Sequence, residues 1–221
     1  MVGPVSSGRR LIVLRHGETT HNAAGIWQGQ LDSPLSERGV EQAYAAGSAL
    51  AALTPVRVVA SDLQRAALTG EAVAKACGVD LSLDKRWREI HAGVWQGMSG
   101  AEVREQWPAE QEKLARGEDF RRGEHGESVA DVARRTAVAV EELVAGLGEG
   151  ETVVVATHGV AGRAAVAGLI GMDQGMAWTT LGGLGNCHWA EVAEGRVGWR
   201  LIRWNVGAPG VTALSGPQSR A

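Results

Sequence analysis

Apolar and polar stretches alternate along the chain in a way that predicts strands separated by helices. Short apolar runs rich in β-branched residues predict buried strands at residues 10–15, 56–60, 80–85 and 152–156. Between them, apolar residues recur every three or four positions, which predicts amphipathic helices over residues 40–51, 63–77 and 129–147. This order predicts an α/β fold, a three-layer α/β/α sandwich with a mostly parallel central sheet.

Serines mark the expected starts of several helices. Ser36 and Ser128 precede helical runs and are candidate N-caps. Two further pairs have the three-residue spacing of a capping box: Ser61 with Gln64, and Ser99 with Glu102.

Three segments depart from the alternation of strands and helices. Residues 187–193 and 197–204 predict a terminal β-hairpin at the sheet edge. Residues 206–221 are rich in Gly, Ala, Ser and Pro and predict a disordered tail, so residues 1–205 are expected to form a single domain. The polar segment 91–127, interrupted by Gly and Pro, is the candidate for a cap over an active site.

Charge and cysteine content narrow the function classes. A formal net charge of -3 gives no basic field for nucleic acid or an anionic membrane. No apolar run is long enough to predict a signal peptide or a membrane span. Cys77 and Cys187 are far apart and lack the spacing of zinc ligands, which favours a reducing, cytoplasmic location.

Charged and nucleophilic side chains gather where the predicted strands end. The first strand ends in Arg15, His16 and Gly17; the second leads to a helix carrying Arg65; the third is followed by Arg88 and Glu89; the fourth is followed by His158 and Gly159. Ligands of open α/β sheets bind beyond the carboxyl ends of the strands, so these side chains are expected in one cleft. Arg65 lies in the first turn of its helix, and helical side chains lean toward the N-terminus, so it should reach this cleft.

Such a set predicts a site for a phosphate group. Arginine forks hold phosphate oxygens, and helix N-termini expected after Gly17, Ser61 and Gly159 would add backbone N–H donors. The cleft contains two histidines and one carboxylate in addition to the arginines, which provides the groups that a phosphoryl transfer needs.

Each of these three groups has an expected role. His16 can attack phosphorus when its ring is neutral, a form that Arg15 and Arg65 favour by lowering its pKa, and a backbone carbonyl is the candidate to fix its tautomer. His158 is expected to donate to the phosphate oxygens. Glu89 is expected to protonate the leaving alkoxide and then to activate water.

A metal site is the main competing interpretation. His16, His91, His158 and nearby carboxylates are possible ligands of zinc or manganese, but no common ligand spacing is present and the arginines would repel a dication. The remaining histidines are expected at the surface or in loops: His21, His125 and His188. The LGGLGN stretch at residues 181–186 resembles a dinucleotide-binding loop, but it precedes a strand instead of joining a strand to a helix.

The candidate site residues lie in or near six sequence motifs: LRHGETTHN (14–22), QGQLDSPLSERG (28–39), SDLQRAALTG (61–70), REIHAGVWQG (88–97), GES (126–128) and ATHG (156–159). Over residues 9–205 the chain resembles the histidine phosphatase superfamily, in the branch shared by cofactor-dependent phosphoglycerate mutases and small-molecule phosphatases. The resemblance implies a phosphoglycerate mutase-like fold, no metal or other cofactor, and a homodimer. It implies a phosphohistidine at His16, phosphate binding by Arg15, Arg65 and His158, and a proton donor at Glu89. By the same resemblance Asn22 and Gln28 line the phosphate pocket.

The branch leaves three functions open. Residues 91–107 lack the basic insert by which mutases of the family grip phosphoglycerate, which favours hydrolysis of a small-molecule phosphate monoester. LGGLGNCHW (181–189) resembles the glucosyl-3-phosphoglycerate phosphatases and implies that substrate. A phosphoglycerate mutase and a non-catalytic module that binds a phosphorylated ligand are the alternatives. In the cap segment Arg121, Arg122 and His125 match no pattern of the family; the two arginines are candidates either for a substrate carboxylate or for a solvated loop.

Overall fold

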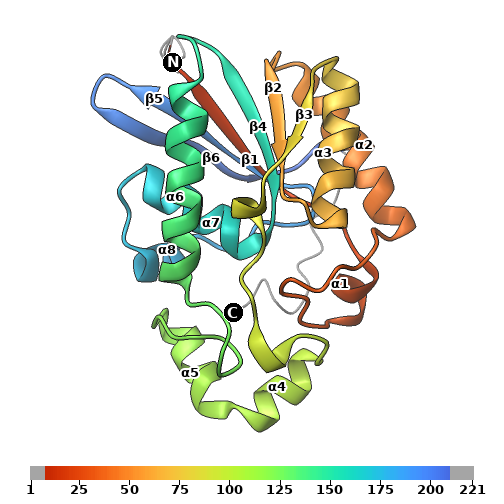
Figure 1. Cartoon of the computed structure of the whole chain (residues 1–221), viewed down its shortest axis with the longest axis vertical. Helices are drawn as coiled ribbons and strands as arrows, with labels where there is room; N and C mark the ends of the chain where they lie inside the picture. The colour runs from red at the N-terminus through yellow and green to blue at the C-terminus, as the bar shows by residue number, and fades with distance from the viewer. Residues whose placement is uncertain (1–7, 210–221) are drawn as a thin grey trace.

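A six-stranded sheet forms the centre of the computed structural model, which describes residues 8–209 (Figure 1). Its strands are β1 (Arg10–Arg15), β2 (Arg57–Ala60), β3 (Leu81–Leu83), β4 (Thr152–Thr157), β5 (Trp189–Gly195) and β6 (Gly198–Val206). They lie in the order β3-β2-β4-β1-β5-β6. Strands β1 to β4 are parallel, whereas β5 is antiparallel to both β1 and β6. The predicted mostly parallel sheet is therefore confirmed.

Helices cover both faces of the sheet, as the three-layer prediction requires. One layer consists of α2 (Glu37–Ala51) and α3 (Gln64–Cys77), and the other of α6 (Val129–Ala145) and α7 (Gly159–Leu169). Successive side chains of a strand point to opposite faces. Leu11 and Val13 accordingly pack with residues of α6 and α7, whereas Ile12 and Leu14 pack with residues of α2 and α3. Both faces of β1 are thus buried, which explains its uninterrupted apolar sequence.

Most of the predicted helix caps are confirmed. Ser36 and Ser128 cap α2 and α6, and Ser99 with Glu102 forms a capping box at α4 (Gly100–Gln106). The capping box expected from Ser61 and Gln64 is wrong, because α3 begins after Leu63 and has no side-chain cap. The hydroxyl of Ser61 instead lies 3.0 Å from Nε2 of His158.

The helix expected directly after Gly17 is also absent. The next helix, α1 (Thr20–Ala24), has only five residues and is capped by Thr19. The N–H of Gly17 donates to the hydroxyl of Thr69 at 3.1 Å, so it is used within the protein and not offered by a helix end.

The segment proposed as a cap forms a small second core beyond the sheet. It contains α4, α5 (Pro108–Arg116) and the short helix η2 (Gly93–Trp95), which lie at the lower end of the molecule in Figure 1. Trp95, Val103 and Leu114 are buried there among partly buried aromatic side chains: Trp27, Trp107, Phe120 and Trp178. Four tryptophans and the one phenylalanine of the chain thus pack in one cluster. Two further short helices, η1 (Lys85–Trp87) and α8 (Gln174–Thr180), complete the fold.

The C-terminal hairpin forms as predicted, with β5 and β6 paired from Trp189 and Val206 to Gly195 and Gly198. Val206 still belongs to β6 and Ala208 is buried, so the ordered chain continues past the predicted start of the tail. The rest of the predicted tail, 210–221, lies outside the described residues. No helix within residues 8–209 has both the length and the apolar character needed to span a membrane.

Candidate active site

A pocket at the carboxyl ends of β1 and β4 collects the residues singled out from the sequence. Its lining comprises Arg15, His16, Asn22, Trp27, Gln28, Gly29, Arg65, Glu89, Ile90, Gly159, Val160, Arg163, Trp178, Gly183 and Leu184. His158 lies directly behind this lining, with its ring centroid 5.1 Å from that of His16. The structure therefore brings all eight predicted site residues together, from five separate segments of the chain.

The ring of His16 is held in one orientation by the backbone of the next residue. Nδ1 lies 2.7 Å from the carbonyl oxygen of Gly17. A carbonyl oxygen can only accept a hydrogen bond, so the ring proton is on Nδ1 and Nε2 carries a lone pair. The predicted fixing of the tautomer by a backbone carbonyl is confirmed. The pKa of His16 lies well below its ordinary value, chiefly because the ring is buried and then because Arg65 and Arg15 are close.

Two buried arginines flank the histidine. Arg65 donates from its two terminal nitrogens to the carbonyl oxygens of Leu31 and Gly29, each at 2.7 Å, and Arg15 donates to that of Leu184 at 2.6 Å. Burial lowers the pKa of Arg65 to about 10, which leaves it charged at neutral pH. The Nε of each arginine is buried and has no hydrogen-bond partner among the described residues. Unused, buried N–H groups of this kind are costly and indicate a ligand with strong acceptors.

His158 occupies the N-cap position of α7, without a side-chain cap hydrogen bond, and is fully buried. Its Nε2 lies 3.0 Å from the hydroxyl of Ser61, and its Nδ1 has no partner within the described part of the chain. The pKa of His158 lies well below its ordinary value because of burial and, after that, because of Arg65. The ring is therefore neutral, with one nitrogen still available to a ligand.

Glu89 lies against the N-terminus of α7. Its Oε1 accepts from the N–H of Ile90 at 2.9 Å and of Ala161 at 3.1 Å, and its Oε2 accepts from the N–H of Val160 at 3.2 Å. Gly159 begins this helix, and a Cβ there would lie 3.7 Å from Glu89 Oε2 and 3.9 Å from Arg15 Nε. The bare glycine thus leaves free space between the carboxylate and the guanidinium, where a phosphate ester can enter.

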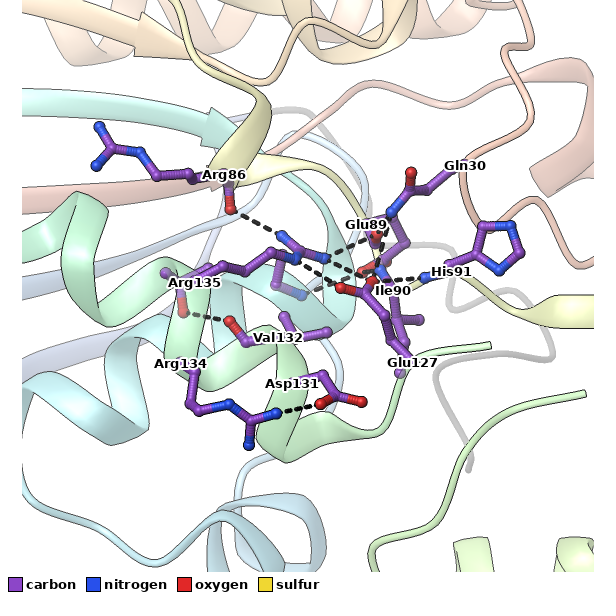
Figure 2. A network of polar contacts seen from close by, with 12 residues as sticks. Gln30, Arg86, Glu89, Ile90, His91, Glu127, Asp131, Val132, Arg134 and Arg135 are labelled. Atoms are coloured by element: carbon purple, nitrogen blue, oxygen red, sulfur yellow. Dashed lines mark hydrogen bonds and ion pairs between the residues drawn. The ribbon is translucent and has the colours of Figure 1, made fainter. Parts of the chain in front are cut away.

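The backbone of Glu89 is fixed from behind by a polar network (Figure 2). Arg135, on α6, donates to the carbonyl oxygens of Glu89 at 3.0 Å and of Arg86 at 2.7 Å, and pairs with both carboxylate oxygens of Glu127. Glu127 in turn accepts from the N–H of His91 at 2.8 Å, and Gln30 donates to the carbonyl of Glu89 at 3.0 Å. Sequence reasoning noted the GES motif but gave it no such role.

The side-chain oxygens of Asn22 and Gln28 are already hydrogen-bonded within the protein, which leaves their amide nitrogens for a ligand in the pocket. Asn22 Oδ1 accepts from Thr19 and from Asn186, and Gln28 Oε1 accepts from the hydroxyls of Thr19 and Ser33. With their oxygens used in this way, the NH₂ groups remain as donors for a ligand. Asn186, which also donates to the carbonyl of His16, belongs to the LGGLGN stretch and was missed as a site residue.

Several candidates lie away from the pocket. Arg88 pairs with Asp62 at 2.6 Å instead of lining the cleft. No residue of the segment 91–127 belongs to the lining; Arg121 and His125 are exposed, whereas Arg122 is buried inside the small second core. His188 is a loop residue as expected but is buried, not at the surface. Within residues 8–209, no group of three or more His, Cys, Asp and Glu side chains is placed to hold a metal ion.

The pocket also contains residues that the sequence did not single out. Trp27, Trp178, Leu184 and Arg163 line it, and they come from loops and helices far apart in the chain. Arg163 lies one helical turn after Gly159 on α7, and this spacing is the one signal from which its position could have been predicted.

Comparisons with known proteins agree with this geometry. Residues 11–207 match the family model described as "Histidine phosphatase superfamily (branch 1)". A protein of Mycolicibacterium vanbaalenii named glucosyl-3-phosphoglycerate phosphatase is 41% identical over 218 residues, which cover 90% of this chain and 96% of that protein. The structure of a mycobacterial glucosyl-3-phosphoglycerate phosphatase with VO3 superposes with a TM-score of 0.85 at 37% identity, covering 90% of this chain and all of the other. A protein of Erwinia tasmaniensis named a probable phosphoglycerate mutase is 32% identical, covering 91% of this chain and 92% of its own.

Proposed function

This chain belongs to branch 1 of the histidine phosphatase superfamily and is a phosphatase, and we propose that it hydrolyses glucosyl-3-phosphoglycerate through a phosphohistidine on His16. The main support for this mechanism is the hydrogen bond that His16 Nδ1 donates to the carbonyl oxygen of Gly17, because it leaves the lone pair of Nε2 free in a positively charged pocket. The substrate is proposed from the names of the relatives that are 41% and 38% identical to this chain.

In the first step, Nε2 of His16 attacks phosphorus, a P–N bond forms and the P–O bond to the leaving group breaks. Glu89 gives a proton to the departing alkoxide. The unused Nε donors of Arg15 and Arg65 bind the phosphate oxygens, where negative charge is spread in the transition state. In the second step, water gives a proton to Glu89 as its oxygen attacks phosphorus, the P–N bond breaks, and His16 returns to its neutral state.

Ser61 supports the proposed role of His158. If its hydroxyl donates to Nε2 of His158, the ring proton must lie on Nδ1, which is the nitrogen without a protein partner. That N–H then donates to a phosphate oxygen. Asn22, Gln28 and the N–H at Gly159 are proposed as further donors at the same group.

The remaining proposals concern cofactors, cellular location and oligomeric state. The pocket chemistry uses no metal or other cofactor, because nucleophile, proton donor and charge stabilisation all come from side chains. A cytoplasmic location is supported by the two cysteines, both of which are free thiols in the structure. A homodimer follows from the family resemblance and is tested by the mass of the protein in solution.

The first experiment compares phosphate release from p-nitrophenyl phosphate by the intact protein, His16→Ala and the control His125→Ala, all in excess EDTA. We expect the intact protein and the control to be active and His16→Ala to be inactive, and the intact protein to release phosphate from glucosyl-3-phosphoglycerate. Activity that EDTA abolishes would restore the metal interpretation. Isomerisation of phosphoglycerate without net phosphate release would instead favour the mutase.

A further inference from the structure

Arg163 is a buried cation at the rim of the phosphate pocket that the proposed chemistry does not use. It lines the pocket, and only 7% of its surface is exposed. Its guanidinium carbon lies 3.9 Å from the ring centroid of Trp178, which also lines the pocket. This stacking fixes the plane of the guanidinium and leaves its edge available for hydrogen bonds.

Among the described residues, Glu89 favours the charged form of Arg163, but no carboxylate pairs with Arg163 directly. Its one hydrogen bond to a described residue is to the carbonyl of Leu181 at 3.2 Å, and it forms no ion pair within residues 8–209. Arg122 lies on the same tryptophan, with its guanidinium carbon 5.4 Å from the ring centroid, and it too lacks an ion pair there. Burial lowers the pKa of each arginine only to about 10, so both are charged at neutral pH. Two buried positive charges beside each other are costly unless an anion compensates them.

The indole of Trp178 adds an unused donor beside these two charges. Its Nε1 is buried and has no hydrogen-bond partner in the described part of the chain. Buried polar groups in folded proteins are nearly always hydrogen-bonded, so this N–H also indicates a missing acceptor.

The position of Arg163 sets where that acceptor lies relative to the phosphate. Gly159 and Arg163 are four residues apart on α7, so their Cα atoms share one face of the helix and are about 6 Å apart along its axis, roughly one turn. The phosphate is proposed to sit at Gly159, between Glu89 and Arg15. A second anionic group one helical turn away fits a carboxylate carried on the short carbon chain that bears the phosphate.

We propose that Arg163, stacked on Trp178, binds the carboxylate of the substrate and makes the enzyme selective for phosphate monoesters of hydroxy acids. This inference rests on the proposed function. The planar fork of an arginine matches the two oxygens of a carboxylate, and the second positive charge at Arg122 strengthens the field at the same place. Arg163 is thus a substrate-binding residue separate from the group that holds the phosphate.

A test uses two substrates that differ only in the carboxylate. In 3-phosphoglycerate a carboxylate occupies the position that a hydroxymethyl group has in glycerol 3-phosphate. We define the preference as the ratio of kcat/KM for 3-phosphoglycerate to kcat/KM for glycerol 3-phosphate. Arg163→Met should lower this ratio by about 10- to 150-fold, the loss expected for a hydrogen-bonded charge pair. Arg163→Lys, which keeps the charge but loses the fork, should lower the ratio less.

Arg196→Met is the matched control, because it removes the same charge from an exposed turn. The pairing of β5 with β1 places Trp189 opposite Leu14 and Ala193 opposite Arg10, so this turn lies at the other end of the strands from the pocket. The control should keep the ratio of the intact protein. The melting temperature and the activity on p-nitrophenyl phosphate show whether each variant is folded.

The outcomes separate this proposal from the proposed function. A ratio within twofold of the intact protein in a folded Arg163→Met overturns the carboxylate site, even if hydrolysis of both substrates slows. Equal losses on both substrates would mean that Arg163 acts through its field on Glu89, which also overturns it. If the intact protein itself shows no preference for 3-phosphoglycerate, the inference is wrong, whereas hydrolysis of none of the substrates would refute the proposed function instead.

Discussion

The network behind Glu89 yields a prediction that compares two neighbouring arginines (Figure 2). Arg135 and Arg134 are adjacent on α6, but successive residues of a helix point about 100° apart. The side chain of Arg135 is 19% exposed and contacts Glu127 and two backbone carbonyls. The side chain of Arg134 is 70% exposed and, within residues 8–209, pairs only with Asp131. Substituting each by methionine removes the same charge and keeps a similar stem, so the pair isolates the network.

The expected cost of Arg135→Met follows from its contacts. The variant loses a two-point pair with Glu127, at 2.9 and 3.0 Å, and donors to the carbonyls of Arg86 and Glu89. Hydrogen bonds to charged groups contribute about 1.5–3 kcal/mol each, but they are not additive and Glu127 is still 23% exposed to water. We therefore expect about 2–3 kcal/mol of lost stability. Arg134→Met should cost less than about 0.5 kcal/mol, as an exposed ion pair does.

Thermal and urea unfolding of the two variants measure this difference. For a chain of this size, 2–3 kcal/mol corresponds to a fall in Tm of about 4–12 °C, against about 2 °C or less for Arg134→Met. Arg135 stabilises the folded protein because it pairs with the charged form of Glu127. Although burial raises the pKa of Glu127, the hydrogen bonds from Arg135 and from the N–H of His91 bring that pKa below its usual value. Equal falls in Tm for the two variants would refute the argument that the network stabilises this end of the molecule.

Two further predictions concern catalysis and pH. Glu89→Gln should lower kcat/KM about 10²- to 10⁴-fold for glycerol 3-phosphate. The loss should be less than about tenfold for p-nitrophenyl phosphate, because its leaving group needs little protonation. Equal losses on both substrates would exclude Glu89 as the acid. His16 and His158 have lowered pKa values in the folded state, so the unfolded chain binds these protons first, and stability present above pH 6.5 is lost as the pH falls. Urea unfolding should therefore show a loss of stability between pH 7 and 5.5. His158→Gln should lose less over that interval, whereas an unchanged loss in the variant would contradict the buried, neutral ring.

The central layers of the fold could be predicted because each strand and helix carries its own periodic signal. The sequence of β1 is apolar at successive positions because Ile12 packs against one helical layer and Val13 against the other. The caps at Ser36 and Ser128 could also be predicted, because each serine side chain accepts from a backbone N–H only three residues away. Local patterns of this kind depend on few residues, and the tertiary structure did not override them.

The failed predictions involve residues whose partners lie far away in sequence. Ser61 has the spacing of a capping box, but its hydroxyl meets His158, 97 positions later, and α3 begins without a side-chain cap. The role of the segment 91–127 as a cap stays a prediction: the segment contributes none of the pocket lining, but it packs against Trp27 and Trp178, which do line the pocket. Its influence on the site is therefore indirect, through these two aromatic walls.

The arginines show most clearly that the sequence alone does not decide which side chains are buried and which are exposed. The chain offers adjacent pairs that look equivalent, Arg121 with Arg122 and Arg134 with Arg135, and in each pair one side chain is exposed and the other turned inward. The arginines nearest the phosphate pocket are held by carbonyl oxygens and not by acids, as the contacts of Arg65 to Gly29 and Leu31 illustrate. Such contacts need no particular residue type at the partner position, so no motif reports them. The positive charge of the pocket is thus left for an anionic ligand by backbone geometry, which only the folded chain reveals.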